Sequence, residues 1–450
     1  MENNIYLCNK CKAFIFSIIN NDKKDIKEII EDDIKCEFCF SSLKLNNNNY
    51  SNLIPKIQEK IKEYEYINLN IQTRFSCLFQ IFHTILIKKL VKITDNEKDI
   101  LESIKPGQIR KLFKEDFIPI FINKLNIKVE SNPGDMIVII SFNFKKNIYD
   151  DFNLLFKEYQ EKDEKLKPIT PEDDNSKIKY YLDSLDITKE KLSEIFPPEK
   201  LNKNLYLDIK IEIAPFYIFG NYIKLSREIG QTKFSRDGVK FALTSIDEEL
   251  KSYLKNIFGN SDEDLVFSAG GREDRDVRML GNGRAFIYSV FNAKKHYSLD
   301  FKEINRNLNK FLTTVKVNGL RICDKKYFNT LKKAESEKIK IYTAVVWSKE
   351  EINKDICDKI GKVKDLLTNQ ITPLRVLHKR VLRTREKFIY EINVKEIINP
   401  HFMIIEIKAS AGTYIKEFVN GDLGRTYPAL CDIIGCECDI LQLDVQDIIL

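Results

Sequence analysis

The pattern of apolar and polar positions predicts both helices and strands in the first half of the chain. Between residues 52 and 95, apolar side chains recur at roughly helical intervals, which predicts a helical region. Residues 135–145 form a dense apolar run after an Asn-Pro-Gly turn, and residues 205–213 alternate between apolar and polar side chains. Both runs are typical of strands, and the alternation indicates one buried face. This half is therefore expected to be an α+β domain that ends near Pro215.

The second half carries three further patterns. Residues 245–258 predict a helix, and the alternating residues 338–346 predict a strand with Lys340 and Tyr342 on one face. Residues 404–418 indicate a strand, a glycine turn and the start of a helix. That helix is expected to carry Lys416 in its opening turn and to end near residues 422–424.

Composition adds a weak bias toward nucleic acid. The chain has 450 residues, 43% of them hydrophobic, which is sufficient for two or three domains. Its 73 basic and 67 acidic residues leave a formal charge of +6, so the bias is slight. The first residues lack the features of a signal peptide, and no run of 18 apolar residues occurs. We expect an intracellular protein of the cytoplasm and/or nucleus, with no membrane partner.

Four cysteines near the start have the spacing of a metal site. Cys8-x-x-Cys11 and Cys36-x-x-Cys39 are two pairs of thiols, and 24 residues lie between the pairs. Each pair can turn two thiolates toward one ion, and four sulfur ligands complete the tetrahedral shell of a structural zinc site. A catalytic zinc is disfavoured, because four thiolates leave no position for water. Ordinary buried thiols are the alternative.

The densest polar segment spans residues 269–284, where three acids, four arginines and four glycines occupy sixteen positions. Glycines permit close backbone approach, arginines can hold phosphates, and an acid among them stays ionised. A salt-bridged, solvated turn is the alternative. A nucleotide-phosphate loop fits poorly, because the chain has no GxxxxGK[ST] and Phe286 occupies the last glycine position of GxGxxG.

A basic strip follows at residues 373–385, with six basic groups if His378 is protonated. This composition indicates a phosphate-contact surface. Its apolar residues are expected to anchor it to the core while the basic side chains face outward; they are Val376, Leu377, Val381 and Leu382. A solvated edge strand is the alternative.

Together these segments resemble pseudouridine synthases, most closely family ten, the archaeal and eukaryotic enzymes that act on the tRNA T arm. The resemblance covers roughly residues 215–450, and the N-terminal CxxC pairs also fit the family. The matching motifs are Gly271–Phe286, Lys340–Ala344, Gly412–Phe418 and Thr372–Arg380. Departures from the family pattern are Asn221 for Arg, Lys233-Phe234 for Pro-Trp, Ala285 for Pro and Lys379 for Arg.

The resemblance implies an α+β fold in three parts. Residues 215–450 would form the pseudouridine synthase catalytic domain, built on a mixed, mostly antiparallel sheet. Residues 46–214 would form a helical and α+β, THUMP-like RNA-binding accessory domain. Residues 1–45 would form the four-Cys zinc module.

The resemblance also implies an activity: isomerisation of a flipped-out uridine to pseudouridine at T-arm positions 54 and/or 55, without an organic cofactor. Asp274 would be the catalytic carboxylate, with Asp276 as second choice. Whether the carboxylate attacks the anomeric carbon or removes a sugar proton is open. Lys416 would lie beside Asp274 and hold it ionised, and Tyr342 would stack on the uracil and assist proton transfer at C5.

The expected partner is tRNA, bound by a monomer. The expected RNA contacts are Arg272, Arg278, Arg284, Arg375, Lys379, Arg380, Lys224 and Arg227. Two alternatives stay open: a non-catalytic tRNA-binding or processing factor with the same fold, and a different base-modifying enzyme such as a methyltransferase, for which no cofactor fingerprint is found.

Overall fold

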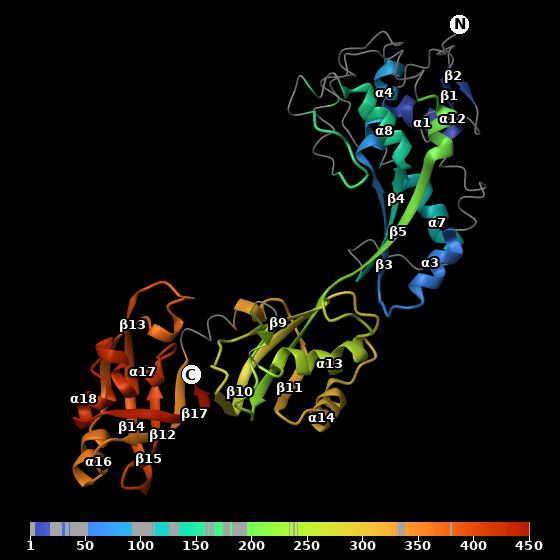
Figure 1. Cartoon of the computed structure of the whole chain (residues 1–450). Helices are drawn as coiled ribbons and strands as arrows, with labels where there is room; N and C mark the ends of the chain where they lie inside the picture. The colour runs from blue at the N-terminus through green and yellow to red at the C-terminus, as the bar shows by residue number, and fades with distance from the viewer. Residues whose placement is uncertain are drawn as a thin grey trace. The chain divides into compact units, whose positions relative to one another are not determined.

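The computed structural model describes most of the chain as two compact units, Met1–Ala214 (unit 1) and Pro215–Leu450 (unit 2) (Figure 1). The described residues are 5–18, 29–31, 36, 53–91, 110, 113–125, 135–157, 161, 166–173, 181, 196–233, 235–236, 239–240, 242–329, 331, 338–378 and 380–449. The predictions for Cys39 and Lys379 lie outside them. Within these ranges, no helix combines the length and apolar character needed to cross a membrane.

Unit 1 contains a three-stranded sheet among its described residues, in the order β3-β4-β5. β3 (Leu69–Phe75) runs parallel to β4 (Met136–Phe144), and β5 (Leu205–Ile213) is antiparallel to β4. The predicted strands at 135–145 and 205–213 are therefore confirmed. The remaining elements are β1 (Ile5–Leu7), α1 (Asn9–Ile18), β2 (Ile29–Glu31), α3 (Leu53–Ile61), α4 (Cys77–Val91), η1 (Phe113–Phe117), α7 (Ile118–Leu125), α8 (Lys146–Leu155) and α12 (Pro198–Asn204).

The helical prediction for residues 52–95 is only partly correct, because β3 separates α3 from α4. Along β3 the buried side chains are Leu69, Ile71 and Phe75, which are separated by two and four residues. This period of two belongs to a strand. Phe75 contributes to two stacks of rings, with Phe79 of α4 and Phe142 of β4, so its apparent helical spacing reflects tertiary packing.

Unit 2 is built on a sheet of ten strands within the described part of the chain. The order is β11-β6-β10-β17-β12-β15-β14-β13-β16, with β9 also paired to β10. Only the pairing of β10 with β17 is parallel, so the expected α+β class with a mixed, mostly antiparallel sheet is confirmed. The strands are β6 (Phe216–Lys224), β9 (Leu265–Ala269), β10 (Val277–Val290), β11 (Val315–Cys323), β12 (Ile339–Ser348), β13 (Lys364–Ile371), β14 (Thr384–Asn399), β15 (Phe402–Ala409), β16 (Thr426–Tyr427) and β17 (Cys438–Ile449), besides the small hairpin of β7 (Ser235–Arg236) and β8 (Val239–Lys240).

Helices of unit 2 follow their sequence signals. α13 (Ile246–Phe258) begins after Ser245, whose hydroxyl accepts a hydrogen bond from the Glu248 amide, and ends at Gly259 in the left-handed conformation. α17 (Ile415–Asn420) carries Lys416 in its first turn, as expected, but ends before residues 422–424, because Gly421 adopts a left-handed conformation. The other helices are α14 (Phe301–Phe311), α16 (Lys354–Gly361), η3 (Leu374–Val376), η4 (Gly421–Gly424) and α18 (Leu430–Ile434).

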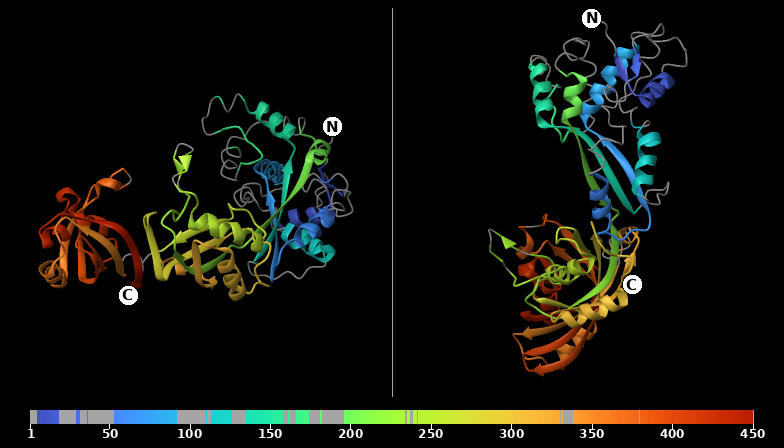
Figure 2. Two further views of the ribbon diagram at one scale, coloured as in Figure 1. Left: turned by 60° about the horizontal axis from the view of Figure 1, so that its bottom comes forward. Right: turned by 90° about the vertical axis from the view of Figure 1, so that its right-hand side faces the viewer.

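The parallel pairing of β10 with β17 joins the two halves of this sheet. It is short, matching residues 277–279 with residues 443–445. The left view in Figure 2 shows the green and yellow strands β6, β10 and β11 on one side and the orange and red strands β12, β14 and β15 on the other. The segment 270–276, which enters β10, therefore lies next to the junction of the two halves.

Candidate active site

The acid-rich segment 270–276 is the loop between β9 and β10, hereafter the 270–276 loop. It carries two carboxylates that reach solvent, Asp274 and Asp276. The side chain of Asp274 is 42% exposed. Both acids are therefore accessible to a ligand.

Two cations meet these carboxylates from elements far away in the sequence. Arg375 Nη1 lies 2.8 Å from Asp274 Oδ2. Lys416 Nζ, from the first turn of α17, lies 2.6 Å from Asp276 Oδ2 and 3.7 Å from Asp274 Oδ2. Lys416 thus lies beside Asp274, but its shorter contact is with Asp276, and Arg375 is the nearer cation of Asp274.

Arg375 also pairs with a second carboxylate, that of Glu417, which the sequence analysis missed. Its Nε and Nη2 donate to Glu417 at 2.6 and 3.4 Å, and Glu417 is buried. Arg375 is therefore a bridge between Asp274 and Glu417 rather than an uncommitted surface arginine. The sequence held one sign of the role of Glu417: it stands next to Lys416, at the start of an otherwise apolar helical turn.

Lys416 keeps Asp276 ionised. Burial alone would raise the pKa of the Asp276 carboxyl, but the hydrogen bond and charge of Lys416 outweigh burial and hold that pKa below its usual value. The carboxylates of Asp274 and Asp276 and the cations of Arg375 and Lys416 thus form one charged group at the 270–276 loop.

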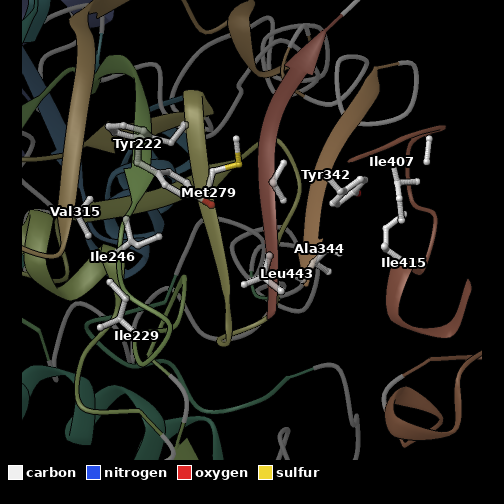
Figure 3. Packing of buried hydrophobic residues seen from close by; sticks show 14 of the residues in the cluster. Tyr222, Ile229, Ile246, Met279, Val315, Tyr342, Ala344, Ile407, Ile415 and Leu443 are labelled. Atoms are coloured by element: carbon white, nitrogen blue, oxygen red, sulfur yellow. The ribbon is translucent and has the colours of Figure 1, made fainter. Parts of the chain in front are cut away.

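Tyr342 of β12 lies in the hydrophobic core of unit 2. Figure 3 shows its ring on the side of Ile407 of the neighbouring strand β15, with Ala344 farther along β12. Burial raises the pKa of the Tyr342 phenol to about 12, and the Arg284 charge acts in the opposite direction. Tyr342 is therefore a protonated phenol at neutral pH, and its ring is held by apolar neighbours.

Two predicted RNA contacts are corrected by their burial. Lys224 is fully buried and donates to three backbone carbonyl oxygens, and Arg284 is buried against Glu273. Neither side chain has a surface to offer to a phosphate. Both instead support the 270–276 loop from within the protein.

Arg227 and Arg278 share one acid, Asp444 of β17. Arg227 Nη2 lies 2.6 Å from Asp444 Oδ1, and Arg278 donates through Nε and Nη2 at 2.9 and 2.5 Å. Arg227 Nη1 also donates to the backbone oxygen of Asp276 at 3.0 Å. These partly exposed arginines therefore connect the loop to β17.

The basic strip at 373–385 forms η3, a connection and the first residues of β14. Arg380 is exposed there, as is Arg272 on the 270–276 loop. Val381 and Leu382 are 82% and 66% exposed, so the expectation that they anchor the strip to the core is wrong. Among the described residues of this connection, the apolar side chains face solvent together with the basic ones.

A cavity of about 350 Å³ adjoins the charged group. Its lining includes Asp276, Arg375 and Lys416, together with the apolar side chains of Leu374 and Leu443. A mixed apolar and charged lining suits a ligand with a planar ring and several hydrogen-bonding groups.

In unit 1, three of the predicted metal ligands come together. The sulfur atoms of Cys8, Cys11 and Cys36 all lie within 4.8 Å of one another, and the three residues are buried. Three converging thiols fit the ligand chemistry of zinc. Cys39, the fourth predicted ligand, is outside the described residues.

Comparison with known proteins gives a family match within unit 2 and several relatives. Residues 217–449 match the family model described as Pus10, C-terminal. The chain is 36% identical over 244 residues to the tRNA pseudouridine synthase Pus10 of Homo sapiens, covering 54% of this chain and 46% of that protein. It is also 36% identical over 244 residues to the tRNA pseudouridine synthase Pus10 of Picrophilus torridus, covering 54% of this chain and 61% of that protein.

The match with the human relative thus spans about half of that protein's length. Among solved structures, a Cbf5-Nop10-Gar1 complex gives a TM-score of 0.28 at 18% identity, covering 51% of this chain and 48% of the other.

Proposed function

The chain belongs to the Pus10 family, and we propose that it is a tRNA pseudouridine synthase that isomerises uridine to pseudouridine in the T arm, at positions 54 and/or 55. Relatives from a eukaryote and an archaeon are both named tRNA pseudouridine synthase Pus10, which supports the reaction on tRNA. The matched residues 217–449 include both loop carboxylates, both cations and Tyr342.

The observation that carries the proposal is the environment of Asp274. Its carboxylate is partly exposed, and Arg375 and Lys416 approach the same oxygen. An ionised carboxylate at this place can attack the anomeric carbon of a ribose or remove a sugar proton, and either route assists departure of the uracil. Both routes end with C5 bonded to the ribose carbon, and neither requires an organic cofactor.

Tyr342 would receive the base. Its ring is buried, so a base would stack on it only after the apolar neighbours move aside. Its phenol stays protonated near neutral pH because its pKa is about 12. Once C5 is bonded to the ribose carbon, C5 must lose its proton while N1 gains one. A protonated phenol cannot remove that proton as a phenolate base, so Tyr342 would relay it, accepting it through the hydroxyl oxygen and giving up its own proton. A uridine reaches such a site only after it leaves its stack, which costs a few kcal/mol.

Binding of the tRNA backbone would fall to the exposed basic residues. Arg272 lies on the 270–276 loop, and Arg380 lies on the solvent-facing connection before β14. Guanidinium groups bind phosphates in a bidentate manner, and several such contacts together give the affinity and its salt dependence. Lys379, which the sequence also predicts to contact phosphate, lies outside the described residues.

Unit 1 would serve as a THUMP-like RNA-binding accessory domain with a structural zinc site. Cys8, Cys11 and Cys36 would hold the ion with Cys39 as fourth ligand, which would stabilise the fold around them and leave no position for catalysis. The protein would act as a monomer inside the cell, in the cytoplasm and/or nucleus.

The test is pseudouridine formation on an unmodified tRNA transcript by the full chain, mapped by carbodiimide treatment and reverse transcription. The wild-type protein should give stops at T-arm uridines. Asp274→Asn should abolish them while tRNA binding persists, and Asp276→Asn should retain part of the activity. Normal product from Asp274→Asn would refute the assignment of the carboxylate. A wild-type protein that binds tRNA without forming product would favour a non-catalytic tRNA-binding factor.

A further inference from the structure

Glu273 lies directly before Asp274, but its side chain points into the protein. The Glu273 side chain is 1% exposed, whereas that of Asp274 is 42% exposed. A carboxylate buried to this degree loses its hydration, which is costly unless all its oxygens find partners. The partners of the Glu273 oxygens therefore show what this buried carboxylate holds in place.

Both oxygens of Glu273 are paired with buried groups. Arg284 Nε donates to Oε2 at 2.8 Å, and the Tyr222 hydroxyl lies 3.0 and 2.9 Å from Oε1 and Oε2. Gln231 Nε2 donates to the Tyr222 hydroxyl oxygen at 2.8 Å. We call these four residues the Glu273 network.

The Glu273 network returns to the backbone of the same loop. Arg284 Nη1 donates to the carbonyl oxygen of Gly270 at 3.0 Å, and Gln231 Nε2 donates to that of Gly271 at 2.8 Å. The loop is therefore held at its first two carbonyls and at the side chain of its fourth residue.

Lys224 holds the following part of the loop. Its buried ammonium donates to the carbonyl oxygens of Asp274 and Arg275 at 3.0 and 2.8 Å, and to that of Ile229 at 3.1 Å. The two peptide units that follow Asp274 are consequently attached to the protein interior, and the buried side chain of Glu273 holds the residue before it. The remaining freedom of Asp274 lies mainly in its own side chain.

A close approach of β10 to β6 brings the network together. Gly283 has φ +77°, and a Cβ at this position would lie 2.5 Å from the carbonyl oxygen of Tyr222. Only glycine fits such a contact. The next residue, Arg284, can therefore reach Glu273 beside the Tyr222 ring.

Stability alone does not account for this arrangement. Replacing a buried ion pair by apolar side chains of similar volume is often neutral or stabilising, whereas removal of one partner is costly. What the charged pair provides, and an apolar pair would not, is a directional attachment between the loop and β10.

We propose that Glu273 is the positioning residue of the catalytic loop: paired with Arg284 and Tyr222, it fixes the backbone so that Asp274 faces Arg375 and Lys416. The inference rests on the proposed function, because it names how the same site holds its carboxylate. Misplacement of a reacting group by about 1 Å can cost roughly 100-fold in rate. Glu273 would thus act on the rate of the chemical step through Asp274, without contact with the RNA.

The first experiment separates position from stability in the full chain. Glu273→Gln should lower the single-turnover rate of pseudouridine formation about 100-fold, with the tRNA Kd changed less than about twofold. The double variant Glu273→Gln, Arg284→Met removes both charges and should recover thermal stability but not the rate. Recovery of the rate together with stability would overturn the proposal, because the pair would then be merely structural.

The second experiment measures the loop directly, by amide hydrogen exchange of peptides that span residues 270–280. Exchange should be faster in Glu273→Gln than in the wild-type protein, and unchanged in Glu437→Gln. This control makes the same chemical change in the exposed pair of Glu437 with Lys349. If Glu273→Gln fails to fold, Tyr222→Phe removes one hydroxyl of the network and should show both effects to a smaller degree.

The two experiments distinguish the inference from the proposed function. Absence of pseudouridine with the wild-type protein contradicts the function, while hydrogen exchange still decides whether the Glu273 network fixes the loop. An active wild-type protein with an equally active, folded Glu273→Gln contradicts the positioning role alone. Unchanged exchange in the folded variants contradicts it as well.

Discussion

Arg375 and Lys416 approach the loop carboxylates unequally, and this difference can be tested. Arg375 is 2.8 Å from Asp274 Oδ2, whereas the shorter contact of Lys416 is with Asp276. Loss of a hydrogen bond between charged groups costs about 1.5–3 kcal/mol, or roughly 10-fold to 100-fold in rate if it acts in the transition state. We expect Arg375→Met to lower kcat by about this factor and Lys416→Met to lower it less.

The control for this comparison is Lys359→Met, which removes a lysine paired with Asp355 on α16, outside the site. Its kcat should equal that of the wild-type protein. Steady-state kinetics on a tRNA transcript provides the measurement. A larger effect of Lys416→Met than of Arg375→Met would reverse the assignment of the counter-ions.

The phenol of Tyr342 defines a pH prediction. Because burial raises its pKa to about 12, it stays protonated throughout the range from neutral pH to pH 10. Tyr342→Phe should therefore lower the rate without moving the alkaline limb of the pH–rate profile, whereas Tyr342→Leu should also lose the stacking face. An alkaline limb below pH 10 that disappears in Tyr342→Phe would contradict a protonated phenol.

The connection between η3 and β14 presents basic and apolar side chains to solvent together. If Arg380 and Arg383 bind phosphates, their replacement by Ala should weaken tRNA binding and reduce the slope of log K against log salt by about 0.7–0.9 per lost contact. Filter binding between low and moderate salt measures this slope. An unchanged slope in Arg380→Ala, Arg383→Ala would remove the connection from the RNA-binding surface.

Elements whose pattern arises from their own local burial were predictable from the sequence. The alternation at 205–213 corresponds to β5, and the strand predicted at 338–346 corresponds to β12 with Lys340 and Tyr342 both buried. In a strand with one buried face, every second side chain points into the core, so the sequence alternates between apolar and polar residues. The cap residues of α13 are likewise local signals.

Contacts between distant segments were not predictable in this way. Arg375 and Glu417 are 42 residues apart, and Arg278 and Asp444 are 166 apart. Nothing in the local pattern distinguishes an arginine that pairs with an acid across the sheet from one that faces solvent. For the same reason Lys224 and Arg284, buried supports of the loop, were indistinguishable from phosphate contacts.

At the scale of unit 2, the ion pairs of Asp444 make stability depend on pH. Burial alone would raise the pKa of Asp444, but Arg278 and Arg227 outweigh it, so the pKa lies below its ordinary value of 3.8. A lowered pKa contributes stability that is present above about pH 4 and is lost as the pH falls through the folded-state pKa.

Asp444→Asn should therefore lower the free energy of unfolding at pH 7 by about 2 kcal/mol and reduce its loss between pH 4 and pH 2. Urea unfolding at several pH values, followed by the near-ultraviolet signal, measures both effects. Glu437→Gln, in an exposed pair, is the matched control and should change neither. An acid loss as steep in Asp444→Asn as in the wild-type protein would contradict the assignment.

For the whole molecule, a zinc ion in unit 1 should stabilise that unit and leave the chemistry in unit 2 unaffected. The sulfur atoms of Cys8, Cys11 and Cys36 converge within 4.8 Å in one compact unit, whereas Asp274 belongs to the other. Metal bound only by the folded state adds its binding free energy to folding.

We expect about one zinc per chain, because four thiolates fill one tetrahedral site. A chelator should lower the melting temperature of unit 1 alone. Cys8→Ser should reproduce this loss and weaken tRNA binding, while the single-turnover rate at saturating tRNA stays that of the wild-type protein. A chelator-sensitive rate at saturating tRNA would contradict a purely structural zinc.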